Sequence, residues 1–149
     1  MKRILITIAA LAVFSIANAQ TKDSVLTSGG KLKPEQAIMD VRHYTIALNI
    51  DFNQRSIEGY TTIDVIMAKP TNVLLFDLMD NYKISSVLVN GKKQPFDFKD
   101  KLITINLDKE LPAGKASVKV FYGGKPHVAR RPPWDDGVTW TKDSTGHQW

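Results

Sequence analysis

The feature that most constrains the fold is a series of short apolar alternations, each ended by turn residues. In residues 44–52 every second side chain is apolar, and this period of two is typical of a strand with one buried face. The apolar positions are Tyr44, Ile46, Leu48, Ile50 and Phe52. Residues 53–56 predict a turn, and residues 57–67 repeat the pattern, so the two runs predict an antiparallel hairpin.

The alternation continues through residue 122 in shorter runs. Residues 73–79 form an apolar run around Asp77, which predicts a strand covered on both faces. Residues 84–89 end at Asn90-Gly91, a pair that favours a type I′ turn and a tight hairpin. We expect the return strand to hold Phe96 and Phe98, with Pro95 placing it at an edge or at the start of a strand. Two further strands are predicted in residues 102–107 and 116–122, separated by a turn at 111–114.

These runs add up to about seven or eight strands, with no convincing amphipathic helix; residues 34–39 allow at most one helical turn. The sequence therefore predicts an all-β fold, either an antiparallel sandwich or a saddle-shaped curved sheet. We expect the core of this β domain in residues 37–123, after a flexible lead-in in residues 20–36.

The N-terminal end has the pattern of a secretory signal peptide, residues 1–19. A basic start at Lys2 and Arg3 precedes an apolar stretch in residues 4–17, and Ala17-Asn18-Ala19 matches an A-x-A cleavage site. The stretch is shorter than the roughly 20 residues that span a bilayer. We therefore expect export to a bacterial periplasm or the extracellular space, with no stable membrane anchor after cleavage.

The charge distribution and the absence of cysteine exclude some classes of function and of stabilising interaction. The net charge is +5, but the basic residues are scattered, whereas a nucleic-acid-binding protein needs a basic stripe with exposed aromatics. We expect no nucleic-acid partner. The chain has no cysteine, so no disulfide stabilises it and no thiolate zinc site is available.

Residues 124–149 form a loop rich in Trp, Pro and Gly that contains all three tryptophans of the chain. A long loop is costly to order, so we expect it to dock on another domain and the chain to be incomplete. The candidate docking residues are Arg130, Arg131, Trp134, Trp140 and Trp149. Tryptophans on such a loop also suit stacking on sugar rings, and this alternative stays open.

No catalytic, metal-binding or cofactor-binding residue is predicted. His43, His127 and His147 do not form a His-Glu-x-x-His pair, and no phosphate-binding loop or nucleophile elbow is present. The carboxylates of Asp135, Asp136 and Asp143 allow two interpretations, paired carboxylates or solvated turns with an Asx cap, and their turn-like context favours the second.

Several segments in order resemble the aminopeptidase N family of zinc metallopeptidases. Residues 40–44 and the strand after them resemble the family's opening, and Ile57-Glu58-Gly59 its second strand. Phe76-Asp77-Leu78 is similar to a Leu-Asp-Leu element, and Val89-Asn90-Gly91 to a hairpin. Residues 122–126 and 132–137 are similar to the family's segment that leads to the substrate cleft. In secreted bacterial members this segment commonly continues with a pattern similar to residues 140–149. One departure is Asp136, which stands where the family more often has Gly.

This resemblance implies an N-terminal β domain that precedes a thermolysin-like catalytic domain. The implied partners are that downstream catalytic domain and, in the parent enzyme, peptide substrates; the implied cofactor is Zn in the parent and none in this fragment. The family's exopeptidase loop and zinc motif do not occur in this sequence, so the resemblance implies a scaffold that is not catalytically competent alone. Two alternatives are an extracytoplasmic β-sandwich module that binds glycans and a plain interaction module.

The signal-peptide hypothesis gives a direct prediction. Because the A-x-A site ends at Ala19, mass spectrometry of the exported protein should find Gln20, or its pyroglutamate, at the N-terminus. A mature chain that still begins at Met1 is the contrary result.

Overall fold

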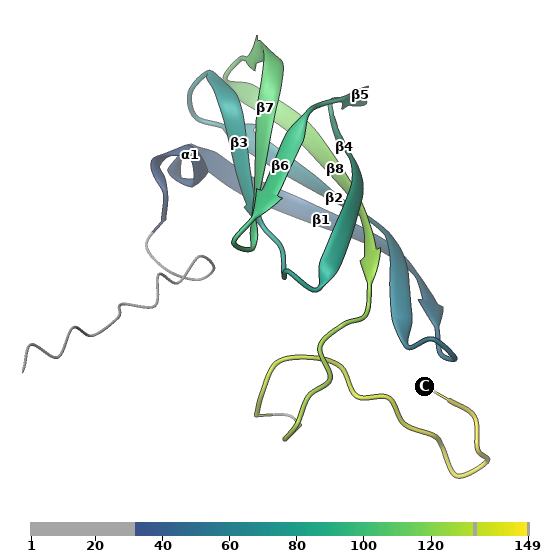
Figure 1. Cartoon of the computed structure of the whole chain (residues 1–149). Helices are drawn as coiled ribbons and strands as arrows, with labels where there is room; N and C mark the ends of the chain where they lie inside the picture. The colour runs from purple at the N-terminus through teal and green to yellow at the C-terminus, as the bar shows by residue number, and fades with distance from the viewer. Residues whose placement is uncertain (1–31, 133, 149) are drawn as a thin grey trace, which may run out of the picture.

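The computed structural model describes residues 32–132 and 134–148 (Figure 1). The predicted signal peptide, most of the predicted lead-in, and Trp149 lie outside the described residues. In the part of the chain that the structure describes, no helix is long and apolar enough to cross a membrane.

One helical turn and eight strands make up the described fold. They are α1 (Pro34–Ala37), β1 (Met39–Asp51), β2 (Ser56–Met67), β3 (Thr71–Asp77), β4 (Tyr82–Val89), β5 (Lys92–Lys93), β6 (Phe96–Lys99), β7 (Leu102–Leu111) and β8 (Gly114–Gly124).

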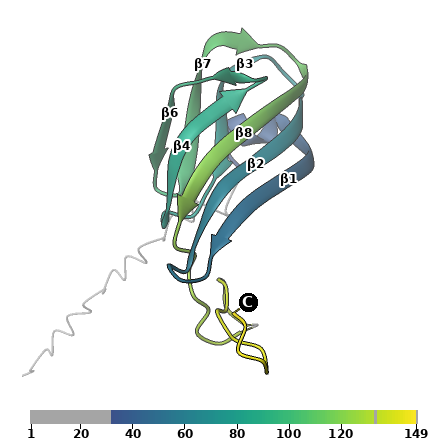
Figure 2. The same ribbon diagram turned by 90° about the vertical axis from the view of Figure 1, so that its right-hand side faces the viewer.

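The strands form two antiparallel sheets that pack face to face (Figure 2). The larger sheet has the order β1-β2-β8-β4-β5, and the smaller has the order β3-β7-β6. Every strand pair in both sheets is antiparallel. The predicted all-β antiparallel sandwich is confirmed.

The core lies between the smaller sheet and one end of the larger sheet. Alternate side chains of facing strands fill it, as the period of two requires. Its buried members are Ile63, Val65 and Met67 of β2, Leu74 and Phe76 of β3, Val87 and Val89 of β4, Ile103, Ile105 and Leu111 of β7, and Ala116, Val118 and Val120 of β8. In β3 three consecutive side chains are buried, because Leu75 is also covered, so the prediction of a strand covered on both faces is confirmed.

The turns use the backbone conformations that the sequence predicts. Asn90 and Gly91 have φ angles of 49° and 78°, the left-handed pair of a type I′ turn. Asp100 and Lys101 repeat this arrangement between β6 and β7, with φ angles of 52° and 63°.

The predicted return strand after Asn90-Gly91 is wrong in one respect. After the turn, only the two residues of β5 return along β4, whose other edge pairs with β8. The strand with Phe96 and Phe98, β6, pairs with β7 in the other sheet. Pro95 lies between β5 and β6 and has no N–H to continue the ladder, while its carbonyl accepts a bond from Asn106 N–H at 3.2 Å. The prediction that the strand after Pro95 lies at an edge is confirmed, but the edge belongs to the smaller sheet.

The predicted burial of the first strand is also wrong. Tyr44, Ile46, Leu48 and Ile50 share one face of β1, as expected, yet their side chains are 54%, 61%, 39% and 48% exposed. The physical reason is the size of the smaller sheet. The distal half of the β1–β2 hairpin extends beyond it in Figure 1, so this part of the inner face has no second layer among the described residues.

Gly59 lets β1 and β2 approach closely in that hairpin. It is paired with Leu48 on β1 and with Tyr122 on β8. A Cβ atom added at Gly59 would lie 3.0 Å from the backbone carbon of Ala47 and 3.0 Å from Cα of Leu48, with the carbonyl oxygen of Ala47 closer still. These are backbone atoms, which cannot turn aside as a flexible side chain would.

We therefore expect Gly59→Ala to lower the free energy of unfolding by about 1–3 kcal/mol, the usual cost of overpacking. Glu58→Ala is the matched control, because Glu58 is exposed on the same strand and should change stability by less than about 0.5 kcal/mol. Urea denaturation of both variants measures the difference. Equal midpoints for Gly59→Ala and the unchanged chain would contradict the close approach.

Candidate functional site

The inner face of the larger sheet is apolar where the smaller sheet does not cover it. We call this the uncovered face and define it by Tyr44, Ile46, Leu48 and Ile50 on β1. Their partners on β2 are Ile63, Thr61, Gly59 and Ile57 respectively. Directly opposed residues lie on the same side of a sheet, so the uncovered face continues the core surface outward without interruption. Exposed apolar surface of this kind is typical of an interaction site.

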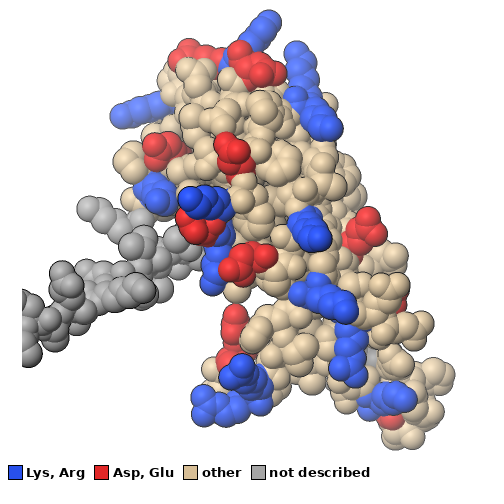
Figure 3. All heavy atoms as spheres, viewed as in Figure 1, with Lys and Arg blue, Asp and Glu red and all other residues tan. Residues whose placement is uncertain are grey.

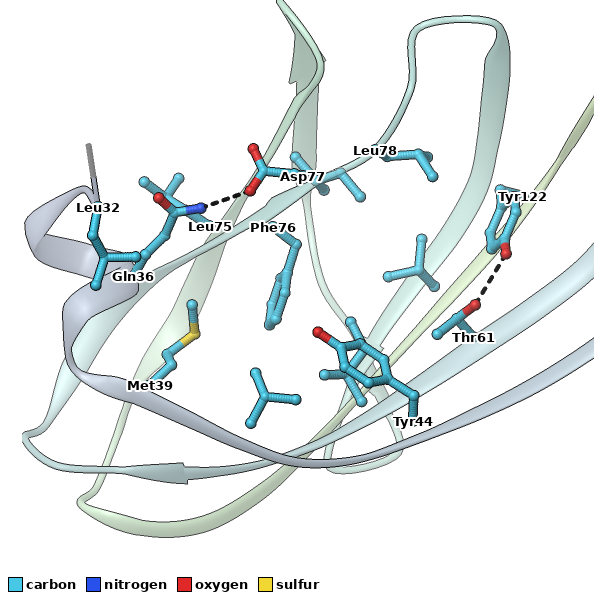
Figure 4. Close-up of a pocket in the computed structure, with 14 residues that line it drawn as sticks. Leu32, Gln36, Met39, Tyr44, Thr61, Leu75, Phe76, Asp77, Leu78 and Tyr122 are labelled. Carbon is cyan, nitrogen blue, oxygen red and sulfur yellow. Dashed lines mark hydrogen bonds between the residues drawn. The ribbon is translucent and has the colours of Figure 1, made fainter. Parts of the chain in front are cut away.

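A groove of about 320 Å³ opens where the uncovered face meets the smaller sheet (Figure 4). Its walls come from α1 and from both sheets, and most of its lining is apolar. The lining residues are Leu32, Gln36, Met39, Val41, Tyr44, Thr61, Ile63, Leu75, Phe76, Asp77, Leu78, Ile103, Val120 and Tyr122. A groove with such walls suits an apolar side chain of a partner and offers no nucleophile paired with a base.

Polar groups occur at two places on the rim of the groove. The Gln36 side-chain amide donates to the Asp77 carboxylate at 3.0 Å, which joins α1 to β3. The hydroxyls of Thr61 and Tyr122 lie 3.0 Å apart across β2 and β8. Both bonds are drawn in Figure 4. They satisfy polar groups within the chain, while the Tyr44 hydroxyl points into the groove, whose other central side chains are apolar.

Tyr82 supports Tyr122 from the neighbouring strand. The two rings meet edge to face with centroids 5.5 Å apart, an arrangement that aromatic quadrupoles favour. Burial raises the pKa of the Tyr82 hydroxyl, opposed in part by its hydrogen bond with Asn81. Tyr122 is thus held between Tyr82 and Thr61, and its position at the groove is fixed.

Four of the predicted docking residues lie on the loop after β8. Backbone N–H groups of Arg130 and Arg131 donate to the Asp135 carboxylate at 2.6 and 2.9 Å, so this carboxylate closes a turn. Both arginine side chains are exposed, and Trp134 is 87% exposed. These three residues face solvent in the described structure.

Trp140 instead packs on the chain itself. Its ring meets the ring of Phe52, beside the β1–β2 turn, edge to face at 6.0 Å. Figures 1 and 2 both show the loop lying below the tip of the β1–β2 hairpin. The buried Trp140 Nε1–H has no hydrogen-bond partner within residues 32–132 and 134–148. The structure thus brings one docking candidate to the distal end of the uncovered face and leaves Trp134 exposed.

The predicted solvated turn at Asp143 is an ordered hydrogen-bonded loop. One carboxylate oxygen accepts from the Thr145 hydroxyl at 2.7 Å and from the N–H groups of Thr145 and His147 at 2.8 and 2.9 Å. The His147 ring lies 2.7 Å from the Thr145 hydroxyl. These bonds, the Thr145 hydroxyl foremost, hold the pKa of Asp143 below its usual value of 3.8.

The histidines do not gather into a metal site. His127 Nε2 lies 4.0 Å from Asp136, and His147 lies 3.7 Å from Asp143, while His43 is exposed on β1. Within the described ranges, no three His, Cys, Asp or Glu side chains form a group that could hold a metal ion. Figure 3 shows basic and acidic groups both distributed over the viewed face, with uncharged surface between them.

Comparisons with known proteins point to one group of enzymes. No model of a known protein family matches this chain, and no curated protein sequence matches it. Among solved structures, an M1 zinc metallopeptidase mutant from Deinococcus radiodurans with bound Tyr-Ser-Ala substrate aligns over 73% of this chain at 21% identity, with a TM-score of 0.57. This chain shares its fold with part of the M1 zinc metallopeptidases.

Two further structures agree with this M1 fold. A two-domain M1 zinc metallopeptidase mutant with bound L-tryptophan aligns over 73% of this chain at 21% identity, with a TM-score of 0.57. Native yeast LTA4 hydrolase aligns over 60% at 18% identity, with a TM-score of 0.50. The chain spans about a quarter of the Deinococcus radiodurans enzyme, 26% of the two-domain enzyme and 15% of the yeast enzyme. The sequence resemblance is confirmed at the level of the fold.

Sequence reasoning missed the groove and the contact between Phe52 and Trp140. Both depend on residues that are distant in sequence. The one local signal is the apolar alternation of β1, which marks the uncovered face but predicts a half-buried strand.

The Asp143 turn gives a prediction for pH. Its folded pKa lies below the unfolded value, so the stabilisation is complete above the usual value of 3.8 and is lost as pH falls through the folded pKa. NMR should show the Thr145 amide, which donates to the Asp143 carboxylate at 2.8 Å, shifting as pH falls below 3.8. Asp143→Asn should remove this transition, and Asp136→Asn should leave it. A midpoint above 3.8 would contradict the hydrogen-bond geometry.

Proposed function

We propose that this chain is the N-terminal β scaffold domain of an exported zinc-dependent aminopeptidase. The observation that carries the proposal is the fold shared with M1 zinc metallopeptidases over 73% of the chain. It is supported by the sequence segments that resemble the aminopeptidase N family in the same order. One of the similar structures holds a Tyr-Ser-Ala substrate, which supports peptides as the substrates of the parent enzyme.

In this proposal the chain has a structural role and contributes no catalytic residue. The described histidines and carboxylates do not fit a zinc centre, because no three of them gather. The catalytic zinc then belongs to residues that this chain does not contain, and the fragment alone is inactive. The role of the scaffold is to form one wall of the substrate cleft.

The docking surface for the catalytic part combines two neighbouring features. The uncovered face and its groove provide apolar surface, and the loop adds the exposed side chains of Arg130, Arg131 and Trp134. Trp149 stays a predicted docking residue outside the described residues. Large rings that are exposed in one domain are typical anchors at an interface, where arginine and tryptophan are enriched.

A second candidate, a glycan-binding module, is favoured by one observation. Trp134 is 87% exposed on a loop, which leaves its ring open for stacking on a sugar. If this candidate is right, tryptophan fluorescence of the chain should respond to an oligosaccharide and Trp134→Ala should remove the response. The scaffold proposal expects no response.

The scaffold proposal makes predictions for the whole gene and for the isolated chain. Coding sequence beyond Trp149 should contain a His-Glu-x-x-His motif, and the whole protein should hold stoichiometric zinc and release N-terminal residues from peptides. The chain from Gln20 to Trp149 should do neither.

In the whole protein, Trp134→Ala should lower the melting temperature by removing a docked ring, while Lys92→Ala, at the far edge of the larger sheet, should not. Tight stoichiometric zinc on the isolated chain would overturn the proposal.

A further inference from the structure

The outer edge of β1 is an unpaired strand edge. β1 is the terminal strand of the larger sheet and pairs with β2 alone among the described strands. It is 13 residues long, and Figures 1 and 2 show no strand beyond it. Backbone N–H and C=O groups along such an edge are a template for another strand.

The middle of β1 lacks the usual devices that block strand addition. Residues 44–50 contain no charged residue and no proline, and the only irregularity of the β1–β2 pairing lies between Val41 and His43. The opposite edge of the same sheet differs. There β5 is two residues long and both are lysine, and the part of β4 that β5 leaves unpaired carries Lys83. Short, lysine-bearing edges resist pairing, so β1 is the exposed edge suited to it.

The sequence of β1 is self-complementary when read antiparallel about Ala47. On the inner face, this register places Tyr44 opposite the partner's Ile50 and Ile46 opposite the partner's Leu48. On the outer face, it places Thr45 opposite the partner's Asn49 and His43 opposite the partner's Asp51, an imidazole facing a carboxylate. Apolar pairs and pairs of hydrogen-bonding side chains are cross-strand contacts that stabilise sheets.

We propose that two copies of this chain associate through their β1 edges, antiparallel, with the two-fold axis at Ala47. The two larger sheets then form one continuous sheet. The pairing closes on itself, so it yields a dimer and no polymer. This inference rests on the β1 edge and does not depend on the proposed function, because backbone edge pairing leaves the uncovered face available for docking.

The absence of cysteine makes the register directly testable. In this register, the two Cα atoms of residue 47 lie about 4.5–5.5 Å apart, within the range of about 4.4–6.8 Å that a disulfide spans. The two copies of residue 45 lie about 14 Å apart, four residues at about 3.4 Å each. Ala47→Cys should therefore form a disulfide-linked dimer on mild oxidation, and the matched variant Thr45→Cys should not.

Light scattering on the mature chain completes the test. For a dimer with a dissociation constant of about 1 μM, the chain at about 100 μM should have the mass of a dimer. Ile46→Lys should yield a monomer with an unchanged far-UV circular dichroism spectrum, because Ile46 is 61% exposed and outside the core. Lys93→Glu, at the opposite edge, should remain a dimer. A monomeric mature chain, or equal cross-linking of Ala47→Cys and Thr45→Cys, would overturn the proposal.

Discussion

The unequal areas of the two sheets determine most of what this molecule presents to its surroundings. Three strands cannot cover a sheet whose first two strands are 13 and 12 residues long. Where the layers overlap, alternate side chains of β2, β4 and β8 are removed from water and form the core. Where they do not overlap, the same alternation leaves isoleucine, leucine and tyrosine exposed on β1. Core and docking surface are thus one continuous apolar face, divided by the boundary of the smaller sheet.

Local patterns in the sequence carried the prediction of the strands and turns, because these depend on neighbouring residues. Asn90-Gly91 specifies its turn through backbone conformations that few other pairs adopt. The alternation in residues 44–50 located β1 but not its environment, since a period of two shows that the faces differ and says nothing of what covers them. Pro95 indicates an edge strand. The sheet to which that edge belongs is set by the pairing of β6 with β7, which the residues around Pro95 do not encode.

The candidate site was less accessible to sequence reasoning than the fold. Arg130, Arg131 and Trp134 were selected by composition, and the structure places them at the surface. Trp140 was selected on the same grounds, yet it contacts Phe52, at the other end of the β domain in sequence. The groove needed α1, β1, β3 and β8 to meet, and no local pattern encodes such a meeting.

The path of the chain between the layers has a consequence for folding. It crosses from the larger sheet to the smaller at β2–β3 and at β5–β6, and it returns to the larger sheet at β3–β4 and at β7–β8. Neither sheet is built from one contiguous segment, so neither forms without ordering residues of the other. β8 is the last strand in sequence and lies centrally between β2 and β4, so the larger sheet cannot be completed until the last strand is available. Since most of these contacts are long-range, we expect the domain to fold in a single cooperative transition and more slowly than helical domains of its size.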